Sequence, residues 1–160
     1  MKIEITIAVK PVIKKYLSLK VNTTPLILSK THAYGIFLYH CLVRISDKNR
    51  PAYSAVDTEK YPDSIKVVIS EDMWRRKGWY IHSQKQADFN KFVAKMLDEE
   101  FHYYMDIQTQ DNHQKIYTSF LKFREKYDFT EDDMPIKTME KNYERYRLEL
   151  SRSLSDKKIS

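Results

Sequence analysis

The chain has 160 residues, a net charge of +6 and only two glycines. This length fits one domain or one domain with an appendage. The scarcity of glycine argues against the phosphate-binding loops of nucleotide-binding folds, in which the backbone must approach the ligand closely. No run of 18 apolar residues occurs, and lysines interrupt the N-terminal segment. The sequence therefore predicts a cytoplasmic protein without a transmembrane helix or a signal peptide.

The N-terminal segment predicts a strand that leads into a helix. Residues 2–9 alternate apolar and other side chains, and Pro11 then suits the first turn of a helix. The same pattern returns at residues 64–70, where Ser70 is a helix cap followed by two acids that suit the helix dipole. The inward-facing residues of the two strands align at a constant offset: Ile3, Ile5 and Ile7 with Ile65, Val67 and Ile69.

A second helix is predicted in each copy, over residues 29–43 and from Ser83 to about Gln108. The repeated unit is therefore strand, helix, helix, and residues 47–63 connect the copies. The stretch from Lys20 to Ser29 in the first copy has no counterpart in the second. The helix that begins at Ser83 opens with a capping box completed by Gln86. Its predicted core residues are Phe92, Met96, Leu97 and Phe101.

Two such strands can satisfy each other's backbone groups and turn one apolar face onto the helices. This arrangement resembles the ribbon-helix-helix family of DNA-binding proteins, here as a pseudo-dimer within one chain. The resemblance implies an α+β, mostly helical fold, in which a two-stranded antiparallel ribbon lies over helices. It covers repeats at about 1–46 and 64–104 of a domain spanning 1–108, and a C-terminal helical hairpin, 109–160, follows as an appendage.

The resemblance also implies a DNA-binding surface. In β-ribbon proteins the ribbon enters the major groove and its outward side chains contact base edges. Alternation makes Lys2, Glu4, Thr6, Ser64, Lys66 and Val68 the expected base contacts. The starts of the two second helices are the expected phosphate contacts, through Ser29, Lys30, Thr31, Ser83, Gln84 and Lys85.

The charge distribution favours the same kind of partner. Residues 1–56 carry nine Lys or Arg side chains against two acids, whereas the rest of the chain is near neutral. A positive field concentrated in one region attracts a polyanion, and nucleic acid is the commonest one in a cytoplasm. The alternative is a solvated, lysine-rich surface that keeps the protein soluble.

The C-terminal part predicts two more helices. One follows a cap at Asp111, a break occupies residues 130–135, and a last helix ends in a frayed tail from Ser155. Acids are interleaved with the bases of the last helix, and the break is acidic, so a second DNA-reading element is disfavoured. We instead expect the last helix to be a structural appendage, or a surface through which the protein forms a homo-oligomer by means of Tyr143, Tyr146 and Leu150.

Enzyme chemistry has little support, and we expect no catalytic residues, no metal and no cofactor. Cys41, the only cysteine, has apolar neighbours that favour a buried core residue over a nucleophile. Glu99 and His102 have the spacing of a di-iron ligand pair, but the sequence holds no second such pair. His102 and Asp106 also share a helix face, which leaves open a single divalent-metal site, although a surface pair is the expected reading.

We therefore predict a sequence-specific protein that binds double-stranded DNA. Its expected role is transcription regulation or another accessory function on a mobile or viral genome. The alternative is a non-enzymatic protein-interaction or assembly module that acts through its aromatic C-terminal helices.

Overall fold

The computed structural model describes residues 2–21, 25–46 and 56–159, which fall into two compact units, Met1–Lys95 and Met96–Ser160. The fold is α+β and mostly helical, as predicted. The first unit holds β1 (Lys2–Val9), α1 (Pro11–Lys20), β2 (Leu26–Ile27), α2 (Ala33–Cys41), β3 (Asp63–Ser70), α3 (Glu71–Lys77) and the first part of α4 (Ser83–Asp106). The second unit holds the rest of α4, the π-helical turn η1 (Ile107–Asp111), α5 (Ile116–Lys126) and α6 (Ile136–Ile159).

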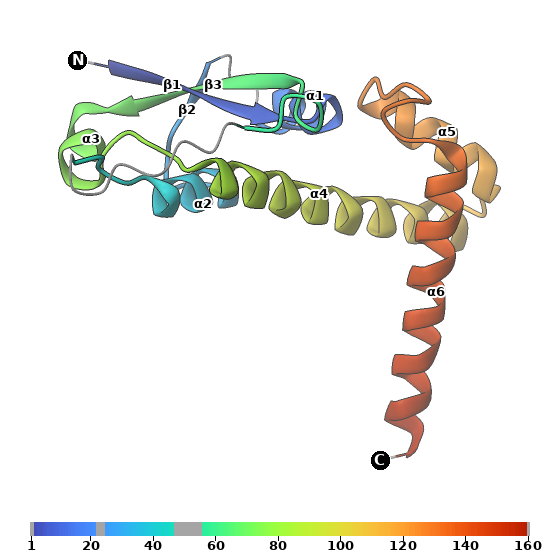
Figure 1. The fold of residues 1–160 in the computed structure, drawn as a ribbon. Helices are drawn as coiled ribbons and strands as arrows, with labels where there is room; N and C mark the ends of the chain where they lie inside the picture. The colour runs from blue at the N-terminus through green and yellow to red at the C-terminus, as the bar shows by residue number, and fades with distance from the viewer. Residues whose placement is uncertain (1, 22–24, 47–55, 160) are drawn as a thin grey trace. The chain divides into compact units, whose positions relative to one another are not determined.

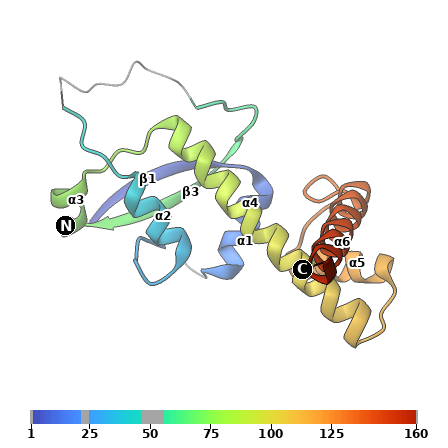
Figure 2. The ribbon, with the colours of Figure 1, turned by 90° about the horizontal axis from the view of Figure 1, so that it is seen from below.

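The predicted pairing of the two long strands is confirmed. β1 and β3 are antiparallel, with Ile5 opposite Val67 and Ile7 opposite Ile65. Ile7, Val67 and Ile69 are fully buried, because the inner face of the sheet is covered by helices. Figures 1 and 2 show α2 and the first turns of α4 on this one side of the strands.

The predicted two-stranded ribbon is wrong, because the sheet has a third strand. β2 pairs in parallel with β3 and gives the order β1-β3-β2. The Leu28 N–H continues this pairing by donating to the Val68 carbonyl at 2.9 Å. β2 comes from the stretch between the helices of the first copy that the second copy lacks. Leu26 and Leu28 are buried while Ile27 is 57% exposed, so joining the sheet covers two leucines.

Helix starts follow local capping chemistry. Pro11 occupies the first turn of α1, as predicted, and the Ser70 side chain caps α3 by accepting from the Met73 N–H at 3.2 Å. The predicted start of the next helix at Ser29 is wrong. The chain stays extended through β2, and α2 begins only at Ala33, where His32 Nδ1 accepts from the Gly35 N–H at 2.9 Å.

Two amide side chains of α4 fix the end of β1. Gln86 accepts from the Ala8 N–H at 2.9 Å. The buried Asn90 accepts from the Lys10 N–H at 3.0 Å and donates to the Ala8 carbonyl at 2.9 Å. Partly buried backbone groups at the strand-to-helix junction are thus satisfied, which holds α4 in register with the sheet.

The predicted core of α4 is correct for Leu97 and Phe101, which are buried. Phe101 packs in the second unit against Phe123 and Phe120, with ring centroids 5.1 and 5.9 Å away. Met96 is half-buried. Phe92 was also expected in the core, but it is only half-buried and stacks on Phe37 at 4.8 Å in the first unit.

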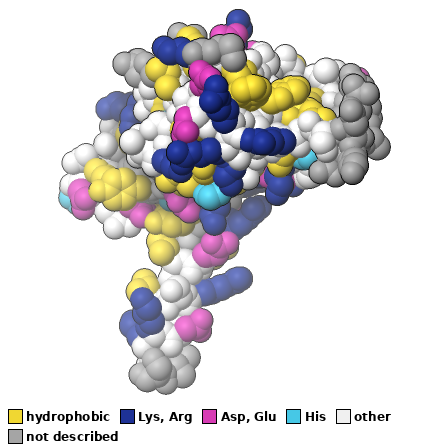
Figure 3. Space-filling view, turned by 90° about the vertical axis from the view of Figure 1, so that its left-hand side faces the viewer, with side chains coloured by type: hydrophobic (Ala, Val, Ile, Leu, Met, Phe, Trp, Pro, Cys, Tyr) yellow, Lys and Arg dark blue, Asp and Glu magenta, His cyan; other side chains and the backbone are white. Residues whose placement is uncertain are grey.

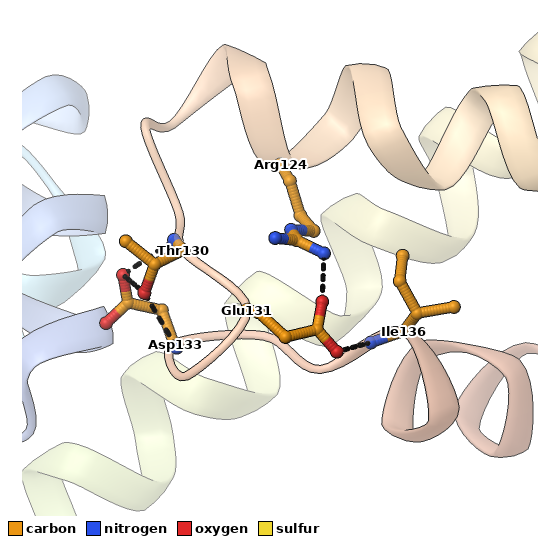
Figure 4. A network of polar contacts seen from close by, with 5 residues as sticks. All are labelled: Arg124, Thr130, Glu131, Asp133 and Ile136. Carbon is orange, nitrogen blue, oxygen red and sulfur yellow. Dashed lines mark hydrogen bonds and ion pairs between the residues drawn. The ribbon is translucent and has the colours of Figure 1, made fainter.

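The break between α5 and α6 lies at the predicted place and is held by its own acids (Figure 4). Glu131 forms an ion pair with Arg124 and accepts from the Ile136 N–H at 3.1 Å, at the positive end of the α6 dipole. Asp133 accepts from the Thr130 N–H at 2.9 Å. The acidic side chains that disfavoured DNA binding by this turn therefore have a structural role as caps.

The bounds of the last two helices differ from the predicted ones. Residues through Asp111 extend α4 as a π-helical turn, so α5 begins at Ile116 and not after a cap at Asp111. The tail expected to fray is helical through Ile159.

Two of the three residues predicted for self-association are engaged within the second unit. Tyr143 is buried, and Tyr146 stacks on His102 with ring centroids 4.1 Å apart. Tyr146 also donates to Asp106 at 2.5 Å, and burial with this carboxylate nearby raises the pKa of Tyr146 to about 12. Leu150 is exposed.

Candidate nucleic-acid interface

The six predicted base contacts all lie on the outer face of the sheet. Lys2, Glu4, Thr6, Ser64 and Lys66 are exposed and Val68 is half-buried. The β1–β3 register places Glu4 opposite Val68 and Thr6 opposite Lys66. The face also carries an acid and an apolar side chain. Lys66 forms an ion pair with Glu4 at 3.0 Å, and the third strand adds the exposed Ile27 beside Val68.

The predicted phosphate contacts at the first helix start have another arrangement. Ser29, Lys30 and Thr31 precede α2, so they do not present its first N–H groups. The Ser29 hydroxyl bonds the Thr31 hydroxyl at 2.8 Å. Lys30 instead places its ammonium over the Tyr39 ring, 4.0 Å from the centroid.

The other predicted phosphate contacts, Ser83, Gln84 and Lys85, lie in the first turn of α4, which begins at Ser83 as predicted. Gln84 donates to Asp88 at 3.0 Å, and Lys85 lies 3.9 Å from the same carboxylate. A phosphate would have to compete with Asp88 for both side chains. Ser83 is half-buried.

A different group of basic and aromatic residues meets at the α3 end of the sheet. It is built by a short antiparallel bridge, in which the Val43 N–H donates to the Tyr80 carbonyl at 2.9 Å and the Tyr80 N–H donates back at 3.1 Å. This bridge brings the segment after α2 against the segment after α3. Gly78 makes the approach possible, since its φ is +102° and a Cβ there would lie 2.3 Å from the Val43 carbonyl oxygen.

The bridge leaves a hollow of about 400 Å³ lined by two arginines and two tryptophans, Arg44, Arg75, Trp74 and Trp79, together with Ile45 and Gly78. Trp79 is 44% exposed, and Trp74 is half-buried. These are the only two tryptophans of the chain. The hollow therefore combines flat aromatic surfaces with guanidinium groups.

Two further cations, Lys30 and Lys77, lie over one tyrosine ring of the same unit. Lys77, at the end of α3, lies over the Tyr39 ring at 5.1 Å, on which Lys30 also lies. We call the group Lys30, Tyr39, Arg44, Trp74, Arg75, Lys77 and Trp79 the basic-aromatic end. Figure 3 looks onto this side of the molecule and shows Lys and Arg side chains gathered on it.

Acids of α3 form ion pairs with its arginines, but these pairs are exposed to solvent and weak. Arg75 is paired with Glu71 at 2.6 Å, and Arg76 is paired with Asp72 at 3.0 Å, both one helical turn apart. The arginine side chains of both pairs are about 70% exposed (70% and 72%). Exposed pairs of this kind stabilise little, so each arginine can exchange its carboxylate for a phosphate at small cost.

Sequence reasoning missed most of the basic-aromatic end. Only Lys30 was among the predicted contacts, and it was placed at a helix start. A signal existed in residues 74–79, which read Trp-Arg-Arg-Lys-Gly-Trp. Basic residues between two tryptophans are typical of surfaces that bind nucleic acid.

The side chains that the sequence offered as a possible nucleophile or metal ligand, Cys41 and His102, are engaged in contacts typical of structural residues. Burial raises the pKa of the Cys41 thiol, which keeps it protonated. His102 Nε2 is hydrogen-bonded to Asn142 Oδ1 at 2.5 Å. Among residues 2–21, 25–46 and 56–159, no three His, Cys, Asp or Glu side chains gather so that they could hold a metal ion.

Comparisons of the chain with protein-family models, with curated proteins and with solved structures found no match. Within the described part of the chain, no helix is both long and apolar enough to cross a membrane.

Proposed function

We propose that this protein binds nucleic acid, with double-stranded DNA as its ligand, through the basic-aromatic end. The observation that carries the proposal is the convergence of Arg44 and Arg75 on a hollow walled by Trp74 and Trp79, with Lys77 directly before the lining residue Gly78 in the chain. Guanidinium and ammonium groups contact phosphates, and the flat aromatic faces contact sugars or bases. The proposal does not depend on a two-stranded ribbon, which the sheet does not form.

The outer face of the sheet has a secondary place in this proposal. Lys2 lies opposite Ser70, directly before α3, so it is the predicted base contact nearest to the basic-aromatic end. A duplex bound at the basic-aromatic end can therefore also contact Lys2. Base reading by the other five residues stays a prediction, which the Glu4–Lys66 pair and the exposed Ile27 make less favourable.

A single strand is the second candidate ligand, because Trp79 is 44% exposed beside the hollow. Unpaired bases stack on exposed aromatic rings, whereas the bases of a duplex are stacked on each other. The affinities for a duplex and for a single strand of the same length, at equal ionic strength, distinguish the two ligands.

Replacing Arg44 or Lys77 with alanine should weaken binding to all duplexes. Each cation that neutralises a phosphate contributes about 0.9 to the slope of log affinity against log salt concentration, or about 0.7 for a single strand. We expect each substitution to reduce that slope by about this amount, as measured by fluorescence anisotropy of a labelled DNA at several salt concentrations.

Lys91→Ala is the matched control, since Lys91 is an exposed lysine of the same unit outside the basic-aromatic end. It should leave the slope unchanged. Equal losses for Lys91→Ala and Lys77→Ala would mean that the chain attracts DNA only by its overall charge. Unchanged binding by both Arg44→Ala and Lys77→Ala would refute the proposed interface.

A further inference from the structure

The second half of α6 is not packed against any other described element of the second unit. Every residue from Arg147 to Lys158 is exposed, and Leu148, Leu150 and Leu154 are 53%, 40% and 61% exposed. Isolated helices of this length are marginal in water, and most helices in proteins are stabilised by packing an apolar face. The three leucines lie within about two turns, with Leu150 and Leu154 one turn apart on the same face, and they indicate a surface that another element covers.

A groove between α5 and α6 continues this surface. It has a volume of about 590 Å³, and its apolar walls include Ile116, Tyr117, Phe120 and Leu148. Ile116 and Tyr117 are 40% and 57% exposed. The rim carries Glu140, Glu144, Arg147 and Ser151 of α6. The groove can thus receive an apolar side chain from a helix that lies along α6.

The charges on this face of α6 indicate which partner helix can pack along it and in which direction. Glu144, Leu148, Ser151, Ser155 and Lys158 follow one another at spacings of four and three residues, so they form one stripe along the helix. The stripe begins with an acid and ends with a base. A second α6 laid antiparallel places each base beside an acid, whereas a parallel one places like charges together.

We propose that the groove and the exposed half of α6 form the interface of a symmetric dimer, in which the α6 helices of two copies pack antiparallel. The two-fold axis passes near Ser151, whose small side chain permits close approach. Leu154 of the second copy then enters the groove beside Leu148, and Lys158 of the second copy meets Glu144. The contact is self-complementary and occurs twice, so the assembly closes as a dimer.

Leu154→Glu tests the apolar part of the interface. The intact chain should sediment as a dimer without DNA, and this substitution should raise its dissociation constant at least about tenfold, because it places a charge in an apolar contact. Circular dichroism should be unchanged, since Leu154 is 61% exposed in the single chain. A chain that stays monomeric at about 200 μM, or a dimer that Leu154→Glu leaves intact, would overturn the proposal, and a monomer would assign the groove to a different partner.

Charge reversal tests the antiparallel register. Glu144→Lys and Lys158→Glu should each weaken the dimer, because each creates two like-charge contacts. A mixture of the two variants should recover the wild-type affinity, since in the mixed dimer both contacts again join opposite charges. Lys157→Glu is the control, because it makes the same charge change about 100° around the helix and should be tolerated. Failure of the mixture to recover association, or equal weakening by Lys157→Glu, would exclude this register.

Discussion

Replacing Phe101 with alanine should destabilise the second unit by about 3–5 kcal/mol, the usual cost of removing a buried phenyl ring. Phe101 is fully buried, and its ring lies within 6.5 Å of those of Phe120, Phe123 and Tyr143. These rings come from α5 and α6, so Phe101 joins the three helices of the unit. A loss of this size is a large part of the stability of a small domain.

Hydrogen exchange in α5 measures this effect, because it reports on the second unit alone. Tyr103→Ala is the control, since Tyr103 is on the same helix but 69% exposed. Exchange in α5 should be much faster in Phe101→Ala and unchanged in Tyr103→Ala. If Phe101→Ala changes the exchange of α5 no more than Tyr103→Ala does, the packing described for this unit is incorrect.

Gly78→Ala should have the second largest effect, and it connects the fold to the candidate site. A non-glycine residue at a φ of +102° is strained by about 1–3 kcal/mol, and the new Cβ would lie 2.3 Å from the Val43 carbonyl oxygen. The Val43–Tyr80 bridge would have to open. We expect lower stability of the first unit together with weaker DNA binding, although no charge is removed.

Lys77→Ala is the neighbouring control for this experiment. It should weaken DNA binding while lowering the stability of the first unit far less than Gly78→Ala does, because it leaves the bridge intact and removes only the contact of the Lys77 ammonium with the Tyr39 ring. Chemical denaturation monitored by tryptophan emission measures the stability of this unit, since Trp74 and Trp79 both belong to it. A Gly78→Ala protein with wild-type stability and wild-type binding would show that the bridge does not form the site.

The two long strands were predictable because their alternation has a simple physical origin. Residues 2–9 and 64–70 each place apolar side chains on one face, their mutual pairing satisfies backbone groups of both strands, and the helices cover the shared apolar face. β2 was not predictable in the same way. Its two residues are too few to show a period, and its pairing with β3 depends on tertiary packing.

The candidate site was less predictable than the fold, because its residues come from three separate segments. Lys30 precedes α2, Tyr39 and Arg44 lie in and after it, and residues 74–79 follow β3. The bridge between Val43 and Tyr80 and the contacts of Lys30 and Lys77 with the Tyr39 ring bring these segments together, and such tertiary contacts have no sequence signature. The Trp-Arg-Arg-Lys-Gly-Trp segment was the one local signal.

Tryptophan emission during a DNA titration tests the central claim most directly. Trp74 and Trp79 both line the hollow, and the chain has no other tryptophan, so a change in emission reports on this site. We predict that adding duplex DNA at low salt quenches or shifts the emission, and that raising the salt concentration reverses the change as contacts with phosphates are lost. DNA binding detected by anisotropy without any change in emission would place the ligand elsewhere, and no binding of the folded chain to duplex or single strand at low salt would contradict the proposed function.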